Sequence, residues 1–108
     1  MSVRRVGRVI KHIVMWTFAD QAEGADKATN LELVRDRLLA LDDLVPGLLT
    51  LEPVIPVDPF EHNYDLVLYS EFESADALRE YATHPEHVAV GGLIKAVATA
   101  RVCVDYEA

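Results

Sequence analysis

Three side chains that can carry protons lie close together in the second half of the sequence. Tyr81, His84 and His87 fall within seven residues, in the pattern Tyr-x-x-His-Pro-x-His. An imidazole titrates at a pKa of about 6.5, so it can accept and return a proton near neutral pH, while a phenol beside it can hold it or polarise a carbonyl group. We therefore predict that His87 and Tyr81 are a catalytic acid/base pair. The alternative is that both only join helix ends to the core through hydrogen bonds.

Two further histidines have alternative roles. His84 precedes Pro85, and a residue before proline avoids the helical region, so His84 is expected either to cap the next helix or to line a pocket. His12 lies in an apolar segment and is either a hydrogen-bonded core residue or part of a pocket wall. His84 and His87 with Glu86 could begin a metal site, but metal sites need three converging ligands and no His-x-x-x-His or cysteine-rich spacing is present. We expect no metal and no cofactor.

Hydrophobic periodicity predicts the elements that position these residues. Residues 10–18 alternate like a strand but carry apolar side chains on both faces. An amphipathic helix of about 18 residues follows, with Asp26 early in it and Pro46-Gly47 at its end. The remaining predicted elements are an edge strand containing Pro53 at 48–55, a loop at 56–63, a strand at 64–72, a helix capped by Ser74 to about 82, a second helix from Pro85 to about 95 that Gly91-Gly92 weakens or ends early, and a strand at 99–106. The order β, α, β, β, α, β predicts an α+β, ferredoxin-like fold, a four-stranded antiparallel sheet with helices on one face.

Charge and composition exclude several classes of partner. The net charge is −8, and four of the ten basic residues (Arg4, Arg5, Arg8 and Lys11) precede the first acidic residue, Asp20. We interpret residues 1–9 as a basic, solvated N-terminal arm and residues 10–107 as one domain. Such an acidic domain repels phosphate backbones, which argues against nucleic acid, and no apolar run approaches the roughly 20 residues of a membrane helix. The single cysteine, Cys103, fits a cytoplasmic protein, and we interpret it as a small hydrophobic residue on a strand.

The face of the sheet that its own helices do not cover needs another partner. We predict that Ile13, Met15, Leu66 and Leu68 face the helices, which places Val14, Trp16, Phe18 and Val67 on the opposite face. Leaving large apolar side chains in water is unfavourable by about 25 cal/mol per Å². We therefore predict a homodimer in which two sheets face each other and enclose a pocket. The residues predicted to line it are His12, Val14, Trp16, Phe18, Val67 and His84.

Several short motifs together resemble the stress-responsive dimeric A/B barrel domain (Dabb) family. They are Lys11-His12-Ile13-Val14, Pro46-Gly47, the strand beginning Tyr64-Asp65-Leu66, Glu71-Phe72-Glu73-Ser74, the Tyr81 to His87 cluster, and Val104-Asp105-Tyr106. The resemblance implies a ferredoxin-like fold that dimerises through its sheets into an α/β barrel. The sequence is distantly similar to a plant member, olivetolic acid cyclase, which closes a linear polyketide without a cofactor. That similarity implies acid/base roles for Tyr81 and His87 and a pocket role for His12.

These observations lead to one functional hypothesis and one rival. The hypothesis is a cytoplasmic homodimer whose pocket holds a small, largely apolar molecule and performs cofactor-free acid/base chemistry on it. The rival is a non-enzymatic stress-related scaffold or binding protein whose barrel is filled by side chains. An open cavity with His12 and His87 at its wall favours the first, and a lumen filled by Trp16 and Phe18 favours the second.

Overall fold

The computed structural model of the chain describes residues 8–57 and 63–108. Four strands and three helices make up the body of the domain: β1 (Ile10–Phe18), α1 (Lys27–Leu39), β4 (Leu48–Val54), β5 (Leu66–Phe72), α2 (Ala75–Thr83), α3 (Pro85–Val97) and β6 (Ala98–Glu107). A small hairpin of β2 (Gln21–Ala22) and β3 (Ala25–Asp26) stands between β1 and α1. The predicted ferredoxin-like order of elements is confirmed.

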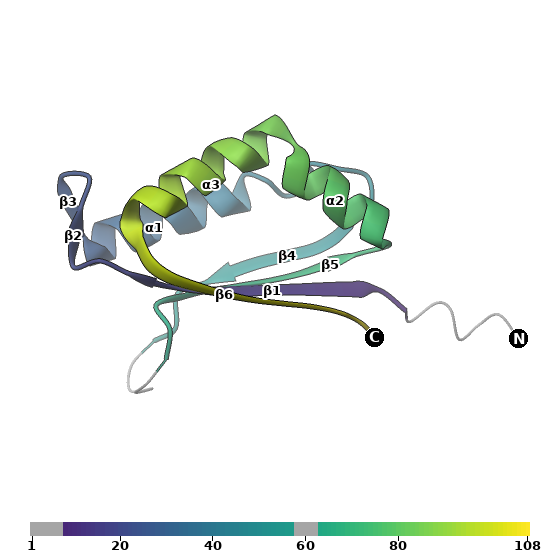
Figure 1. The fold of residues 1–108 in the computed structure, drawn as a ribbon, viewed down its shortest axis with the longest axis horizontal. Coiled ribbons are helices and arrows are strands. Elements are labelled where there is room, and N and C mark those ends of the chain that lie inside the picture. The colour runs from purple at the N-terminus through teal and green to yellow at the C-terminus, as the bar shows by residue number, and fades with distance from the viewer. Residues whose placement is uncertain (1–7, 58–62) are drawn as a thin grey trace, which may run out of the picture.

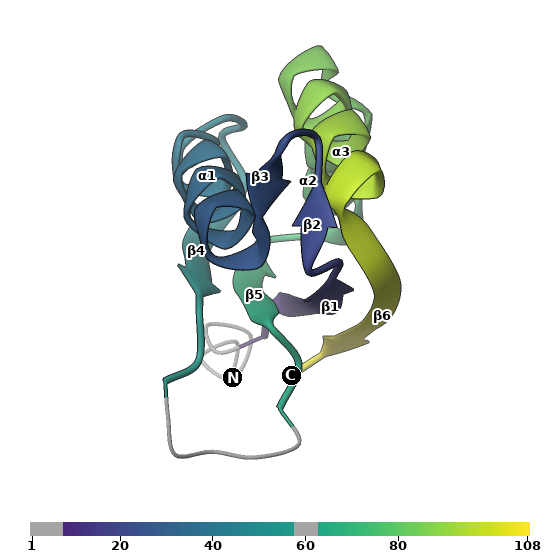
Figure 2. The ribbon, with the colours of Figure 1, turned by 90° about the vertical axis from the view of Figure 1, so that its left-hand side faces the viewer.

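The main sheet is antiparallel throughout, with the strand order β4-β5-β1-β6. All three helices lie on one side of it (Figure 1). The end-on view in Figure 2 shows α1 on the side of β4 and α3 on the side of β6. The strand that contains Pro53 is an edge strand, as predicted, because a proline cannot donate a hydrogen bond to a second neighbour.

Capping residues define where the helices begin. The Asp26 carboxylate accepts a hydrogen bond from the backbone N–H of Thr29 at 2.9 Å at the start of α1. The prediction that this helix runs on to Pro46-Gly47 was wrong: α1 ends at Leu39, and a turn follows in which Asp43 has a positive φ of 64°. The break between α2 and α3 at His84 is confirmed, whereas Gly91-Gly92 do not end α3, which continues to Val97.

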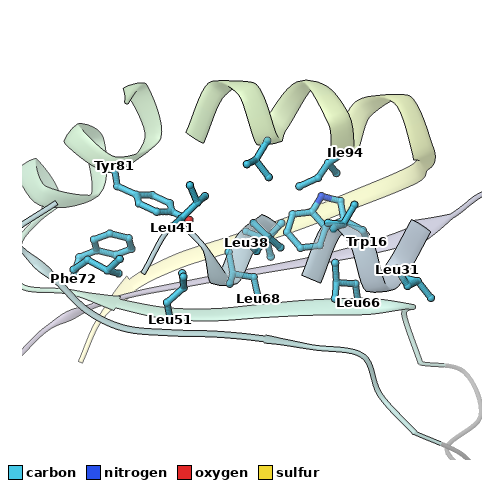
Figure 3. Packing of buried hydrophobic residues seen from close by; sticks show 14 of the residues in the cluster. Trp16, Leu31, Leu38, Leu41, Leu51, Leu66, Leu68, Phe72, Tyr81 and Ile94 are labelled. Atoms are coloured by element: carbon cyan, nitrogen blue, oxygen red, sulfur yellow. The ribbon is translucent and has the colours of Figure 1, made fainter. Parts of the chain in front are cut away.

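The core lies between the sheet and the helices, and it corrects the predicted orientation of β1. Val14, Trp16 and Phe18 are at most 4% exposed and belong to the core on the helix side of the sheet, where Figure 3 shows Trp16. The prediction that they line the opposite face was therefore wrong. In the antiparallel register Val14 pairs with Leu68 and Trp16 with Leu66, and paired residues share a face. Both faces of β1 are apolar, so alternation alone could not show which one the helices cover.

The other face of the sheet is apolar and only partly buried. It carries Ile13, Met15 and Val67, and on the edge strand β6 also Val102 and Val104, which are 40% and 50% exposed. Ile13 and Met15 were predicted to face the helices and instead lie here, while Val67 lies here as predicted. The sheet therefore presents an uncovered apolar surface, although its members differ from those predicted.

Two further expectations concern the ends of the chain and membranes. Residues 1–7 of the predicted basic arm lie outside the described residues, and Arg8 forms a salt bridge with Glu107 at 3.1 Å. Among the helices of the described residues, none has the length and apolar character to span a bilayer.

Candidate functional site

His12 is held rigidly on the helix side of the central strand β1. It is 9% exposed, and the hydroxyl of Ser70 on β5 donates to its backbone carbonyl at 2.9 Å. Its ring Nδ1 forms a hydrogen bond with the carboxylate of Asp105 on β6, the residue directly opposite it in the ladder. Ser70 therefore holds the backbone of His12, and Asp105 holds its ring in one orientation.

The junction of α2 and α3 places Tyr81 and His87 against each other. His84 ends α2 and caps α3, because its Nδ1 accepts from the backbone N–H of Glu86 at 3.1 Å. The chain then turns sharply, and the rings of Tyr81 and His87 lie 4.6 Å apart, centroid to centroid. Tyr81 is fully buried and also packs on Phe72 at 5.1 Å, and Phe72 is 6.3 Å from the ring of His12. Figure 3 shows the Tyr81 ring reaching from α2 over Phe72.

Two polar atoms in this region are buried without a hydrogen-bond partner among the described residues. They are the hydroxyl of Tyr81 and the Nδ1 atom of His87. A buried polar atom left unpaired is unfavourable by about 1–3 kcal/mol, so each such atom in a folded protein calls for an explanation. Both atoms belong to the pair singled out from the sequence.

Burial shifts the protonation of both groups. Burial lowers the pKa of His87 below its ordinary 6.5; the backbone of Ala82 partly offsets this shift, and electrostatic interactions with the side chains of His12 and Arg101 add to it. Burial raises the pKa of Tyr81 to about 12. Near neutral pH His87 is therefore an uncharged base, and Tyr81 keeps its proton.

A cavity of about 250 Å³ lies between the sheet and α3, and both imidazoles reach its wall. His12 comes from the sheet and His87 from the start of α3. The remaining lining is mostly apolar: Val14, Trp16, Leu68, Gly91, Ile94, Lys95 and Arg101. This cavity is formed by a single chain on the helix side of the sheet, and it is not the predicted pocket between two facing sheets.

The residues predicted from the sequence to form the site divide into two groups. His12, Val14, Trp16 and His87 line the cavity, and Tyr81 lies behind His87 without being part of its wall. Phe18, Val67 and His84 are not among the lining residues: Phe18 is in the core, Val67 is on the uncovered face of the sheet, and His84 caps α3.

Sequence reasoning missed the two cationic residues of the cavity, Lys95 and Arg101. Arg101 lies directly opposite Trp16 in the β1–β6 ladder, so the two share a face, and Lys95 is in the last turn of α3. The alternation of β6 does place Arg101 on the same face as Cys103 and Asp105, but only the register shows that this face adjoins the cavity.

The region beside His12 also has atoms that could bind a metal ion. His12 Nδ1, Cys103 Sγ and a carboxylate oxygen of Asp105 all lie within 4.8 Å of one another. Burial and the charge of Asp105 raise the pKa of the Cys103 thiol, and the guanidinium of Arg101 interacts with the same sulfur. A metal ion needs the thiolate form and avoids a neighbouring cation, so this position is poorly suited to one.

Comparison with protein families identifies the chain. Residues 10–108 match the family model described as Stress responsive A/B Barrel Domain (Dabb). The chain belongs to this family, as its motifs and its fold had indicated. A search of curated proteins finds no match to it.

Solved structures agree with this fold and include dimers and an enzyme. A dimeric protein of unknown function from Bacteroides fragilis is 32% identical, with a TM-score of 0.81 over 93% of this chain and 96% of its own. A dimeric ferredoxin-like protein of unknown function from Thermobifida fusca is 24% identical, with a TM-score of 0.83 over 94% and 92%. A hydroxynitrile lyase from Passiflora edulis is 12% identical, with a TM-score of 0.77 over 94% of each chain.

Proposed function

We propose that the protein is a homodimer in which each subunit binds a small, largely apolar molecule between its sheet and α3, and that His87 and Tyr81 perform acid/base chemistry on this molecule without a cofactor. The reaction would begin with removal of a proton from a carbon next to a carbonyl group, as in a polyketide cyclase. The observation that carries the proposal is the pair of unpaired polar atoms, His87 Nδ1 and the Tyr81 hydroxyl, beside an open apolar cavity.

His87 has the properties of a general base in this reaction. It lines the cavity, and its lowered pKa keeps the imidazole free to accept a proton at neutral pH. A well-placed general base accelerates proton transfer by about 10² to 10⁴. Tyr81 keeps its proton and can donate a hydrogen bond to His87 or to an oxygen that gains negative charge. Because Tyr81 lies behind His87, a direct role for it requires the ligand to reach past the imidazole.

Dimerisation through the uncovered face of the sheet is supported by two observations. That face carries Ile13, Met15, Val102 and Val104, and a second copy of the same sheet would cover them. Two of the similar solved structures are described as dimeric. The dimer would stabilise the sheet, while the cavity of each subunit stays on the helix side.

The rival hypothesis, a non-enzymatic scaffold or binding protein with a filled barrel, is supported less well. Trp16 and Phe18 do fill space, but they do so in the core of one subunit, and a cavity of about 250 Å³ remains next to Trp16 with both imidazoles at its wall. That volume is somewhat below the range of about 300–1,000 Å³ of ordinary ligand pockets, so it suits a small ligand. The hydroxynitrile lyase has the same fold, which shows that the fold can support an enzyme.

Exchange of hydrogen for deuterium tests the proposed chemistry without knowledge of the natural substrate. Benzylacetone, a small aromatic ketone, would be incubated with the protein in deuterated water, and loss of its α-proton signals followed by NMR. We expect the wild-type protein to accelerate exchange over buffer, and His87→Gln to remove at least about 90% of the acceleration, because a general base is worth 10²-fold or more. His84→Asn, which can still cap α3, is the matched control and should keep the rate. No acceleration by the wild type, or equal rates for His87→Gln and wild type, would contradict the proposal.

A further inference from the structure

The charged side chains on the cavity wall are all basic. Lys95 and Arg101 line the cavity together with the imidazoles of His12 and His87, and no carboxylate is among the lining residues. This is unexpected for a chain with 18 acidic and 10 basic residues. Asp105, the acidic residue close by, is bonded to His12 and is not part of the wall.

Lys95 and Arg101 line a second hollow as well as the cavity. A neighbouring hollow of about 290 Å³ is also lined by these two residues, with Trp16, Ile94 and residues 98–100. The two cations therefore lie where the two hollows meet, one on the last turn of α3 and one on the edge strand β6. Arg101 is close enough to His87 to lower its pKa.

Both cations lack a carboxylate partner within the described ranges. Of the six other basic residues there, four form a salt bridge with a carboxylate: Arg8, Lys27, Arg35 and Arg79. Neither Lys95 nor Arg101 does so among residues 8–57 and 63–108. Arg101 interacts instead with the thiol of Cys103 and with the imidazole of His87. Two cations without a carboxylate partner on the wall of a mostly apolar cavity attract a negatively charged group and can donate hydrogen bonds to both of its oxygens.

We propose that the ligand of this cavity carries a carboxylate, bound between Lys95 and Arg101, on an apolar or aromatic body that lies against Trp16 and Ile94. The inference rests on the proposed ligand-binding function and specifies its substrate class: a small carboxylic acid, with its anionic end beside Arg101 and its body within reach of His87. Trp16 is the only tryptophan of the chain and lines the cavity, so its fluorescence reports on the occupant directly.

A matched pair of probes separates the anion site from the cavity itself. Hydrocinnamate and hydrocinnamyl alcohol share a phenylpropyl body and differ in the charged group. Binding of each would be measured with the whole protein by the fluorescence of Trp16 and by calorimetry. We expect hydrocinnamate to bind at least about tenfold more tightly, because a charge-assisted hydrogen bond contributes more than this factor. Raising the salt concentration should weaken the binding of hydrocinnamate and leave the binding of the alcohol nearly unchanged.

Charge-removing variants assign the effect to the two residues. Arg101→Gln and Lys95→Gln should each lower the affinity for hydrocinnamate several-fold and leave the affinity for the alcohol unchanged. Arg37→Gln, which removes one exposed charge on α1, is the control for net charge and should change neither affinity. Equal binding of the two probes, or unchanged hydrocinnamate binding in both variants, would overturn the carboxylate site while leaving the cavity and the proposed acid/base chemistry standing. Failure of both probes to bind would overturn the ligand-binding cavity and the carboxylate site together.

Discussion

The ring of Tyr81 lies 4.6 Å from the ring of His87, centroid to centroid, at an interplanar angle of 57°. The two residues belong to different helices, and the sharp break at His84-Pro85 makes the contact possible. Each ring carries one buried polar atom without a partner. A purely structural contact of two rings would not need these polar atoms, so they provide a way to separate a functional role from a structural one.

Replacing Tyr81 with phenylalanine tests whether its hydroxyl stabilises the fold. Because the hydroxyl has no partner, Tyr81→Phe removes an unpaired buried polar atom, and the free energy of unfolding should stay the same or rise by about 1 kcal/mol. Ser70→Ala is the matched control, because the Ser70 hydroxyl is also fully buried but donates to the His12 carbonyl. This variant should lower the free energy of unfolding by about 1 kcal/mol. Urea unfolding measures both. If Tyr81→Phe lowered the free energy of unfolding as much as Ser70→Ala, the Tyr81 hydroxyl would have a stabilising partner. That result would argue against its proposed role in acid/base chemistry.

The lowered pKa of His87 predicts a dependence of stability on pH. In the unfolded chain His87 takes up a proton at a pKa of about 6.5, whereas in the folded protein it does so only at lower pH. Between these two values the unfolded state binds more protons, so stability rises with pH through this window and is constant, as far as His87 is concerned, on either side of it. NMR titration should show one imidazole with a pKa below 6.5 that is absent in His87→Gln, and the variant should have a shallower slope of stability against pH. A pKa above 6.5 for this imidazole would show that it is paired with an acid.

The proton-handling residues could be identified from the sequence because they are close together along the chain. The pattern from Tyr81 to His87 contains its own helix break, because Pro85 disfavours the helical conformation of His84 through a local steric clash. The cationic residues of the cavity could not be identified in this way. Arg101 meets Trp16 only through the pairing of β6 with β1, and such a pairing depends on a register set by the whole fold.

The orientation of β1 shows the same limit. Alternation correctly grouped Val14, Trp16 and Phe18 on one face, and a strand whose two faces are both apolar gives no further information. On β5 the assignment was right because Leu66, Leu68 and Phe72 contrast with Asp65 and Glu71 on the other face. The wrong assignment of faces therefore concerned β1, the strand without a clearly polar face. The same strand contributes Ile13 and Met15 to the uncovered apolar surface.

A charge on the uncovered face of the sheet should break the proposed dimer. Val104 is 50% exposed and pairs with Ile13 across the ladder. In Val104→Glu a carboxylate would be buried unpaired between two sheets, which is unfavourable by several kcal/mol, so the dimer should dissociate at least about a hundredfold more readily. Sedimentation analysis measures the change. Leu39→Glu is the matched control, because Leu39 is 47% exposed but lies on α1, and it should leave the dimer intact. An unchanged dimer in Val104→Glu would place the interface elsewhere.

Substitution of two glycines by alanine should change the stability of the protein in opposite directions. Gly47 precedes β4, and a methyl group there would collide with the side chain of Ala77 on α2 and press on Glu73, while the backbone N–H of Glu73 donates to the Gly47 carbonyl at 2.9 Å. Gly47→Ala should therefore lower the free energy of unfolding by about 1–3 kcal/mol, since α2 must move away from the sheet. Gly92 lies inside α3 with open space around it, so Gly92→Ala should raise stability by up to about 1 kcal/mol through its better helix propensity. Thermal and urea unfolding of the two variants and the wild type would measure both changes in stability. If Gly47→Ala were neutral, α2 could shift without loss, and the close packing that holds Tyr81 against His87 would not be as rigid as the contact implies.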